Sequence, residues 1–361
     1  MQRSRPFLPA LLLLAALAAY LSPQWQRSLP GFSGGVQPQV APAVPDLSAP
    51  LSVGSRELFN KVRPASVQIE QLGSDGSGGL GSGFFITPGG LLLTAYHVVD
   101  GARVIRVRTV SQQTFPARVV GFDNAADVAL LQIQTRGQVP YLNLAPRTPR
   151  IGEPVLAVGN SGGDFLQPRR GRLLALGAQA GNATFPQNTL EMSAPLAPGD
   201  SGGPIVDASG KAIGVVSYVR VDDQGKTLSS YAVPVTAGEG LITELRAGTK
   251  RDVPAIGLYF DQEHDGRTDP AGGVVASVVR GSPASRAGLR GERLDAGHQL
   301  LGFGDVILSV GGVRTRNADD VIFEIRRRHI GESVTLGVVR DGKRRDVELP
   351  LVAKGSLSFQ E

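Results

Sequence analysis

The chain contains no cysteine, and this absence excludes disulfide frameworks, thiolate zinc sites, iron–sulfur clusters and cysteine nucleophiles. Only 4 histidines are present, so neither a metal nor a cofactor is expected. Aromatic residues are also scarce, at 6%. The 47 glycines and 25 prolines do not recur with the three-residue period of collagen, and this composition favours short strands and turns over a helical bundle. Covalent chemistry in this chain therefore has to use oxygen nucleophiles.

Strong charge of one sign is missing as well. Lys and Arg total 37 against 32 Asp and Glu, a formal net charge of +5. The densest basic clusters, Arg326–His329 and Arg169–Arg172, lack the interleaved aromatic residues that stack on bases, so we expect solvated faces and no nucleic-acid partner. At 361 residues the chain exceeds one compact domain of about 150 residues, and two folded domains are expected.

Residues 1–22 have the form of an export segment. Arg3 and Arg5 precede an apolar run from Phe7 to Leu21. This run of about fifteen residues is shorter than the roughly 20 of a spanning helix, so a cleaved signal peptide and a retained membrane anchor are both open. Small residues at Ala16–Ala18 suit cleavage, but the apolar stretch continues past them, which favours the anchor.

The rest of the chain divides by composition. Residues 23–52 are a tether rich in Pro, Gly, Ser and Gln. Residues 53–246 show an all-β rhythm, in which short apolar runs alternate with turn signals and a short helix at Ala237–Arg246 closes the unit. The expected strands are Ser66–Gln71, Gly83–Thr87, Leu91–Ala95, Val104–Val110, Ala117–Phe122, Val128–Gln134, Val155–Val158, Ile213–Val219 and Ser230–Val233.

A second β-rich domain is expected at residues 255–353, after a polar linker at 247–254 and before a tail at 354–361. Two helical pieces interrupt its strands, at Ser282–Leu289 and at Ala318–Arg328. Asn317 is a suitable N-cap for the second helix, which has acidic residues in its first turn and arginines in its last.

Three separated segments supply what a nucleophilic triad needs. The first, Gly199–Pro204, sets Ser201 among glycines that let successive N–H groups point to one spot, as a nucleophile with an oxyanion hole requires. Of the histidines, His97 ends an apolar strand and is the candidate base. The base needs a carboxylate to fix its tautomer, and Asp127 directly precedes a core strand, with Asp123 in a nearby turn as the competitor.

The order His, Asp, Ser is that of chymotrypsin-like enzymes. From about residue 53 to 353 the chain resembles the HtrA/Deg serine proteases, and a one-domain C-terminal unit follows the matching segments. These segments are GSGFFI (81–86), LLTAYHVV (92–99), DVALLQI (127–133), AVGNSGG (157–163), PGDSGGPI (198–205) and AIGVVSYV (212–219).

This resemblance implies an all-β dominated fold, with a chymotrypsin-like double β-barrel protease domain followed by a β-sandwich-like PDZ domain with two helices. It carries over His97, Asp127 and Ser201 as the triad, and the N–H groups of Gly199 and Ser201 as the oxyanion hole. Two positions depart from the family pattern. Asp200 stands where the family usually has Asn or Ser, and Tyr96 stands before the base where Ala is usual, which predicts a narrower substrate cleft.

The residues of the substrate pocket limit which substrate side chains it can accept. Trypsin-like enzymes that select basic side chains carry Asp six residues before the nucleophile, where this chain has Pro195. The pocket walls implied by Val215, Val216, Ser217 and Tyr218 are apolar or small, with only Tyr218 able to crowd them. Such a pocket leaves a substrate charge unpaired, so we expect cleavage after small aliphatic residues.

The C-terminal unit resembles a PDZ domain in its SPASRAGL and GFGDVILSV patterns. Ile256-Gly257-Leu258 matches the loop whose N–H groups capture a C-terminal carboxylate, so hydrophobic C-terminal peptides are the expected partners. Residues 291–301 form an insertion of unassigned role. One PDZ domain, a short loop at residues 71–80 and an N-terminal anchor resemble the stress-sensor DegS type, which implies a periplasmic homotrimer at the inner membrane, with Leu58 and Phe59 where the family packs its trimer.

Two functional hypotheses follow. The first is an envelope serine endopeptidase that cleaves misfolded or regulatory proteins through an acyl-enzyme and is controlled by peptides at the PDZ domain. The alternative is a catalytically silent PDZ scaffold or chaperone on a protease fold. The intact triad positions and oxyanion glycines favour the enzyme.

Overall fold

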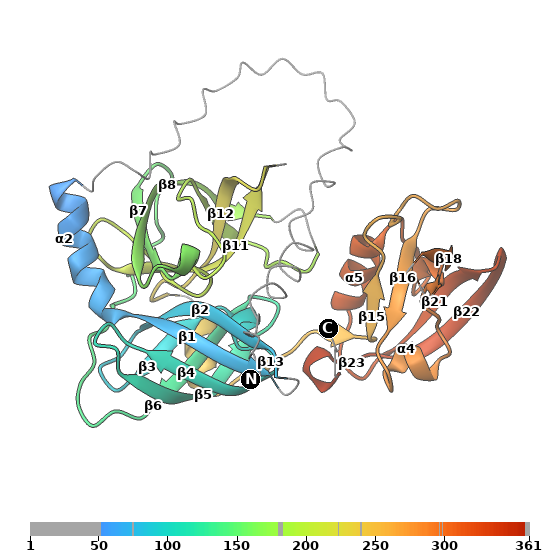
Figure 1. Cartoon of the computed structure of the whole chain (residues 1–361), viewed down its shortest axis with the longest axis horizontal. Helices are drawn as coiled ribbons and strands as arrows, with labels where there is room; N and C mark the ends of the chain where they lie inside the picture. The colour runs from blue at the N-terminus through green and yellow to red at the C-terminus, as the bar shows by residue number, and fades with distance from the viewer. Residues whose placement is uncertain are drawn as a thin grey trace, which may run out of the picture.

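The computed structural model describes residues 52–357 apart from 74–75, 180–182, 223, 239, 296 and 298. It shows two β-barrels followed by a smaller β-rich domain (Figure 1). The expected export segment, residues 1–22, and the tether up to residue 51 lie outside the described residues, as does the tail beyond residue 357. Within the described part, no helix has both the length and the apolar character needed to span a membrane.

The first barrel closes through pairing of β5 with β6, in the order β5-β4-β1-β2-β3-β6. Helix α2 (Val53–Val62) precedes it, capped by Ser52, whose hydroxyl accepts from the N–H of Ser55 at 3.3 Å. Short 3-10 turns lie at η3 (Arg63–Ala65) and η4 (Tyr96–Val98). The strands are β1 (Ser66–Gly73), β2 (Gly78–Phe85), β3 (Leu91–Thr94), β4 (Ala102–Arg108), β5 (Thr114–Asp123) and β6 (Val128–Ile133).

The second barrel is closed in the order β10-β11-β12-β9-β8-β7. A 3-10 turn, η5 (Ser161–Gly163), joins β7 to β8. The strands are β7 (Pro154–Gly159), β8 (Gln167–Ala178), β9 (Thr189–Met192), β10 (Pro204–Val206), β11 (Ala212–Val221) and β12 (Thr227–Pro234). The expected all-β fold with a double barrel is confirmed.

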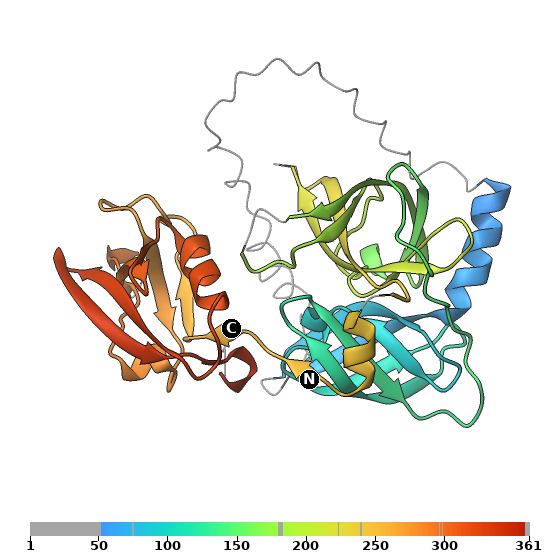
Figure 2. The ribbon, with the colours of Figure 1, turned by 180° about the vertical axis from the view of Figure 1, so that it is seen from behind.

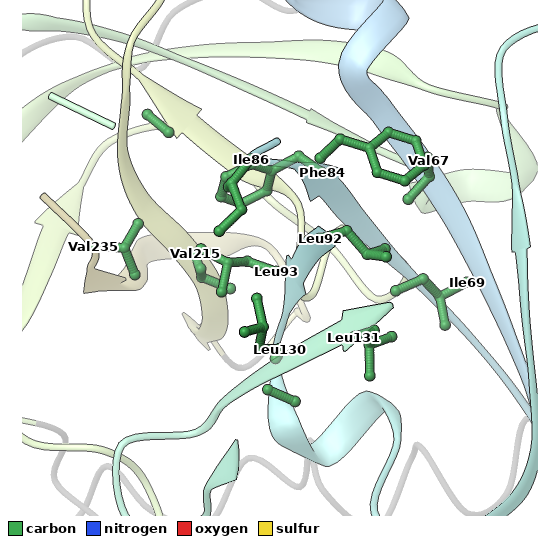
Figure 3. Close-up of a cluster of buried hydrophobic side chains, with 14 of the residues drawn as sticks. Val67, Ile69, Phe84, Ile86, Leu92, Leu93, Leu130, Leu131, Val215 and Val235 are labelled. Carbon is green, nitrogen blue, oxygen red and sulfur yellow. The ribbon is translucent and has the colours of Figure 1, made fainter. Parts of the chain in front are cut away.

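One apolar core joins the two barrels (Figure 3). Inward-facing side chains of β1, β2, β3 and β6 pack together with Val215 and Val235 from the second barrel. Full burial of a side chain such as Leu130 or Phe84, both 0% exposed, stabilises a fold by about 1.5–3 kcal/mol. The shared core therefore fixes the two barrels against each other at the place where the loops with His97 and Ser201 meet.

The expected strands are all present, but sequence reasoning missed β8, β9, β10 and helix α2. Strand β8 begins with Gln167-Pro168-Arg169-Arg170, a polar stretch without apolar alternation. Strand β10 has only 3 residues and directly follows the glycine-rich motif. Helix α2 carries an apolar face too narrow to stand out, with Val62 its only buried residue.

The segment after the second barrel returns to the first. Helix α3 (Gly240–Arg246) packs on β5 and β6, as the yellow helix in Figure 2 shows. Within the expected linker, β13 (Lys250–Arg251) then pairs in parallel with β5. The side chain of Arg251 also reaches the first barrel, with Nη1 2.5 Å from Asp123 Oδ2. The chain is therefore bonded to the barrel until just before the C-terminal domain.

The C-terminal domain is built on a sheet in the order β15-β16-β19-β21-β22, with β20 paired to β19 and two small two-stranded sheets, β14 with β23 and β17 with β18. The strands are β14 (Pro254–Ala255), β15 (Leu258–Phe260), β16 (Gly273–Val278), β17 (Arg293–Leu294), β18 (Leu300–Gly302), β19 (Val306–Val310), β20 (Val313–Arg314), β21 (Ser333–Arg340), β22 (Lys343–Pro350) and β23 (Val352–Ala353). A last turn, η6 (Lys354–Ser356), follows.

Both expected helices of this domain are present but shorter, as α4 (Pro283–Arg286) and α5 (Ala318–Arg326). Asn317 caps α5, accepting from the N–H of Asp320 at 2.9 Å, as predicted. The loop after β8 approaches α5 (Figures 1 and 2): the N–H of Ala183 donates to Asp319 Oδ1 at 3.3 Å, and Arg326 Nη1 donates to the Ala183 carbonyl at 2.9 Å.

Candidate active site

His97 lies on η4, directly after β3, and Asp127 lies directly before β6, which pairs with β3. His97 Nδ1 is 2.9 Å from Asp127 Oδ2 and 3.1 Å from Oδ1. The N–H of His97 also donates to Asp127 Oδ1 at 2.9 Å. With the proton on Nδ1 facing the carboxylate, Nε2 is left as the basic nitrogen.

Asp127 adopts a left-handed backbone, with φ 55°, which is uncommon for a residue other than glycine. Its carbonyl accepts from the N–H of Tyr96 at 3.2 Å, and its own N–H donates to the Asn124 carbonyl at 3.3 Å. Such backbone strain persists where surrounding bonds determine the conformation, and it gathers at functional sites. Here it turns a buried carboxylate toward His97.

Asp123, the competing carboxylate, is placed elsewhere. Its Oδ1 accepts from the N–H of Ala126 at 2.9 Å, and its Oδ2 pairs with Arg251. The carboxylate that faces His97 is therefore Asp127.

His97 and Asp127 change each other's pKa values. Burial on its own would lower the pKa of His97, but the charge and the hydrogen bond of Asp127 outweigh it and raise this pKa above 6.5. Half of the His97 side chain stays exposed, at 51%, which limits the effect of burial. Burial would raise the pKa of Asp127, but His97 and the hydroxyl of Ser217 lower it below its usual range. Near neutral pH, Asp127 is therefore a carboxylate.

Ser217 on β11 connects the carboxylate to the nucleophile. Its hydroxyl donates to Asp127 Oδ2 at 2.5 Å, and its carbonyl accepts from the hydroxyl of Ser201 at 3.4 Å. Sequence reasoning assigned Ser217 to the substrate pocket and missed the contact with Asp127. The available signal was a polar residue in the apolar run Ile213–Val219, because a buried hydroxyl needs a hydrogen-bond partner.

Ser201 lies in the loop that leads into β10, and its backbone is held from the first barrel. The N–H of Ser82 on β2 donates to the Ser201 carbonyl at 2.8 Å, and the hydroxyl of Ser82 donates to the Gly199 carbonyl at 2.7 Å. Gly202 has φ +84°, and a Cβ there would collide with the Ser82 carbonyl and the hydroxyl of Thr94. Only glycine fits this position.

The candidate oxyanion donors are the N–H groups of Gly199 and Ser201. Gly199 has φ +101°, and a Cβ would lie 2.7 Å from the Asn160 carbonyl. Among the hydrogen bonds within the described ranges, neither N–H has an acceptor. Both are therefore available to an oxygen that develops negative charge.

The five expected pocket residues are spread over different surroundings. Val215 and Val216 are 0% and 2% exposed and belong to the barrel cores, so their side chains fill the barrels instead of a pocket. Pro195 is half-buried after β9. The ring of Tyr218 is stacked between Phe185 at 4.5 Å and Tyr231 at 4.4 Å, and burial raises its pKa to about 12.

Tyr96 does not narrow the cleft as expected, because its ring is buried and stacked on Phe122 with centroids 4.4 Å apart. Its hydroxyl donates to Asp100 Oδ1 at 3.0 Å. Asp100 Oδ2 in turn pairs with Lys354 Nζ at 2.7 Å. The segment that follows the C-terminal domain is thus bonded beside η4, which carries His97.

In the C-terminal domain, Ile256 is buried in the core, and its carbonyl accepts from the N–H of Ala284 at 3.0 Å. Gly257 follows, with its carbonyl bonded to the N–H of Val279 at 3.0 Å, and Leu258 opens β15, paired with Val278. Strand β15 is an edge strand of its sheet, where a peptide can add as a further strand. The insertion at 291–301 contributes β17 and most of the hairpin to β18.

Comparisons with known proteins agree with this architecture. A model of the trypsin-like peptidase domain matches residues 81–215, and a model of the PDZ domain matches residues 254–351. A "Probable periplasmic serine endoprotease DegP-like" of Pseudomonas savastanoi pv. phaseolicola is 29% identical, covering 91% of this chain and 71% of that protein. "Protease Do-like 1, chloroplastic" of Arabidopsis thaliana is 31% identical, covering 76% and 64% respectively.

Among solved structures, "HtrA-type protease AlgW with tripeptide" is similar in fold, with a TM-score of 0.50 and 23% identity, covering 85% of this chain and 98% of that one. Within the described residues, no group of His, Asp and Glu side chains is arranged to hold a metal ion.

Proposed function

We propose that the chain is an HtrA-type serine protease, with a trypsin-like peptidase domain and one PDZ domain, and that it acts in the cell envelope as an endopeptidase on misfolded or regulatory proteins. One observation carries this proposal. Asp127 bonds both His97 and Ser217, and the Ser217 carbonyl accepts from the hydroxyl of Ser201, so Ser217 links the proposed nucleophile to the His97–Asp127 pair.

The proposed reaction uses these residues in the roles that such triads have. Ser201 Oγ attacks the peptide carbonyl carbon while His97 Nε2 takes the hydroxyl proton, and Asp127 stabilises the imidazolium that forms. The N–H groups of Gly199 and Ser201 bind the oxyanion. His97 then returns the proton to the leaving amine, and water hydrolyses the acyl-enzyme by the same proton transfers in reverse.

We place cleavage after small aliphatic residues such as Val or Ala. The support is Pro195, which stands where a carboxylate would pair with a basic substrate side chain. An unpaired substrate charge in an apolar site costs several kcal/mol of desolvation. Profiling with a peptide library should show Val and Ala before the scissile bond, and a preference for Lys or Arg would contradict this specificity.

We also propose that C-terminal hydrophobic peptides regulate the protease through the PDZ domain. A peptide added beside β15 lies next to α5, and α5 is bonded to Ala183 of the protease loop. That loop also carries Phe185, stacked on Tyr218 next to Ser217. A homotrimer through α2, where Leu58 and Phe59 are half-buried, and an inner-membrane anchor through residues 1–22 complete the proposal.

The test uses the full chain purified in detergent, with Ser201→Ala as the matched variant. Each is incubated with an unfolded protein, with and without peptides that end in a hydrophobic residue and a free carboxylate. Cleavage that needs Ser201 and rises with peptide supports a peptide-regulated protease. Cleavage retained by Ser201→Ala would overturn the mechanism. Peptide binding without cleavage under any condition would favour the silent scaffold instead.

A further inference from the structure

Asp200 lies between the two candidate oxyanion donors, and its carboxylate is buried, with only 1% of the side chain exposed. Its Oδ1 accepts from the N–H of Ser161 on η5 at 3.0 Å. Its Oδ2 accepts from the N–H of Ala197 at 3.1 Å. The carboxylate thereby ties the start of the loop before Ser201 to the turn that follows β7.

The backbone is shaped to receive this carboxylate. Gly159 ends β7, and a Cβ at this position would collide with Asp200 Oδ1 and approach the Asp200 Cα to 2.8 Å. A side chain at position 159 would therefore push the loop of Gly199 and Ser201 away from the second barrel. The close approach of β7 and this loop fixes where both oxyanion N–H groups lie.

A buried carboxylate is costly unless a counter-ion and hydrogen bonds compensate it. Among the ion pairs of the described residues, Arg169 on β8 is the only basic partner of Asp200, with Nε 3.9 Å from Oδ2. Arg169 is itself largely buried, at 18% exposure, and its Nη2 donates to the hydroxyl of Ser161 at 2.9 Å. It therefore contacts both the carboxylate and the turn to which the carboxylate is bonded.

We propose that Arg169 is a positioning residue for catalysis, which holds Asp200 in place and thereby sets the oxyanion donors. Its guanidinium touches no reacting atom and acts through Asp200. The inference rests on the proposed protease function and adds a residue to it. Without Arg169, the buried charge of Asp200 is uncompensated, so the carboxylate moves toward water and carries the N–H groups of Gly199 and Ser201 with it.

The experiment compares Arg169→Met, Asp200→Asn and the double variant, all in the full chain. Loss of correctly placed oxyanion donors lowers kcat, and removal of one donor costs about 10²–10³ in known cases. We expect Arg169→Met to lower kcat by about 10²-fold with KM changed less than twofold. Inhibition by a peptide boronate, whose tetrahedral adduct places an oxygen in the same hole, should weaken in parallel. Asp200→Asn alone should keep kcat within about tenfold of the parent, because the amide is neutral and its oxygen still accepts one N–H.

The double variant is the decisive arm. Removing the buried charge together with its counter-ion should restore kcat to within about fivefold of Asp200→Asn alone, since the coupling between two contacting residues is then absent. Arg172→Met is the matched control, because Arg172 lies on the same strand but bonds the distant Gly152 carbonyl. It should leave kcat within twofold. Unchanged kcat in Arg169→Met, or a loss that the double variant does not recover, would overturn the proposal.

A second readout separates this inference from the proposed function. Amide hydrogen exchange at residues 196–201, measured in the Ser201→Ala background, needs no activity. It should accelerate in Arg169→Met and return toward the parent rate in the double variant, while Arg172→Met has no effect. If this exchange pattern appears although the protein cleaves no substrate, the proposed protease function is wrong, but Arg169 still positions the loop at residues 196–201. If cleavage depends on Ser201 but Arg169→Met changes neither the exchange rate nor kcat, only the positioning role of Arg169 is wrong.

Discussion

The two halves of the candidate active site are built differently. His97 and Asp127 flank the paired strands β3 and β6 of the first barrel, and they are joined by the contacts of His97 Nδ1 with both carboxylate oxygens and by one hydrogen bond from the His97 main chain. Ser201 lies in a loop of the second barrel, where Ser82, Ser217 and Gly202 hold it at the junction with the first. The first half depends on a charge and a hydrogen bond, whereas the second depends on close backbone approach. Substitutions should therefore affect the two halves in different ways.

The largest effect is expected in the first half. Asp127→Asn should lower kcat by about 10⁴, because the amide stabilises the wrong His97 tautomer and removes the charge that balances the imidazolium. Steady-state kinetics measures this effect, and Asp123→Asn is the matched control. Since Asp123 pairs with Arg251 away from His97, its variant should lose less than tenfold. Equal losses in the two variants would mean that Asp127 is not the catalytic carboxylate.

In the second half, Gly199→Ala should lower kcat by about 10²-fold or more with little change in KM, since the added Cβ meets the Asn160 carbonyl and displaces an oxyanion donor. Gly163→Ala controls for backbone strain, because Gly163 has φ +81° but open space around its Cβ. Kinetics of the two variants, with thermal unfolding beside them, separates the displaced donor from lost stability. A kcat as low in Gly163→Ala would point to strain alone.

Ser217 joins the halves, and Ser217→Ala should lower kcat by about tenfold through the lost hydrogen bond to Asp127, worth about 1.5 kcal/mol when the acceptor is charged. The Ser217 carbonyl stays in place, so KM should change little. Ser229→Ala, at a buried serine that accepts from Arg220, serves as the control in the same assay. An unaffected kcat in Ser217→Ala would show that Asp127 needs no second donor.

The pH dependence tests the charge in the first half. His97 has to be neutral to act as a base, so activity should disappear as pH falls through its pKa, which Asp127 holds above 6.5. In Asp127→Asn the raising charge is gone and burial still lowers the pKa, so the midpoint should move to lower pH. NMR titration of His97 in the Ser201→Ala background measures both. A midpoint that stays in place would contradict the pairing.

The smallest effect concerns a residue beyond the PDZ domain. The positive charge of Lys354 lowers the pKa of His97 and pairs with Asp100, so Lys354→Met should raise this pKa slightly. The same NMR titration detects the shift, and Lys343→Met, at an exposed position on β22, is the control. A downward shift, or equal shifts in both variants, would show that the charge of Lys354 does not act on His97.

The first half was easier to predict from the sequence than the second. His97 and Asp127 flank apolar strands whose patterns are strong, and the motif around Ser201 is distinctive in itself. The supports of Ser201 come instead from Ser82, Asn160 and Ser217, which are far apart in the chain and are brought together by barrel closure. Local patterns contain no information about such distant contacts.

Strand β8 illustrates the same limit in the fold. Its first residues include Arg169, which is largely buried beside Asp200, so an ion pair stands where an apolar residue would have helped to mark a strand. The prediction that Val215 and Val216 line the substrate pocket differs from the structure for another reason. They were placed by resemblance along the chain, and only the barrel geometry shows that their side chains point into the cores.

The parallel pairing of β13 with β5 has a consequence for anyone who builds chimeras of this protein. Lys250 and Arg251 come after the last helix of the peptidase unit, yet their backbone pairs with β5 of the first barrel, and the side chain of Val253 is still buried. A junction at residue 247 would remove β13, and with it the pairing to β5, from the peptidase unit. A foreign recognition module should be fused after Val253, so that β13 and the buried Val253 stay with the peptidase unit.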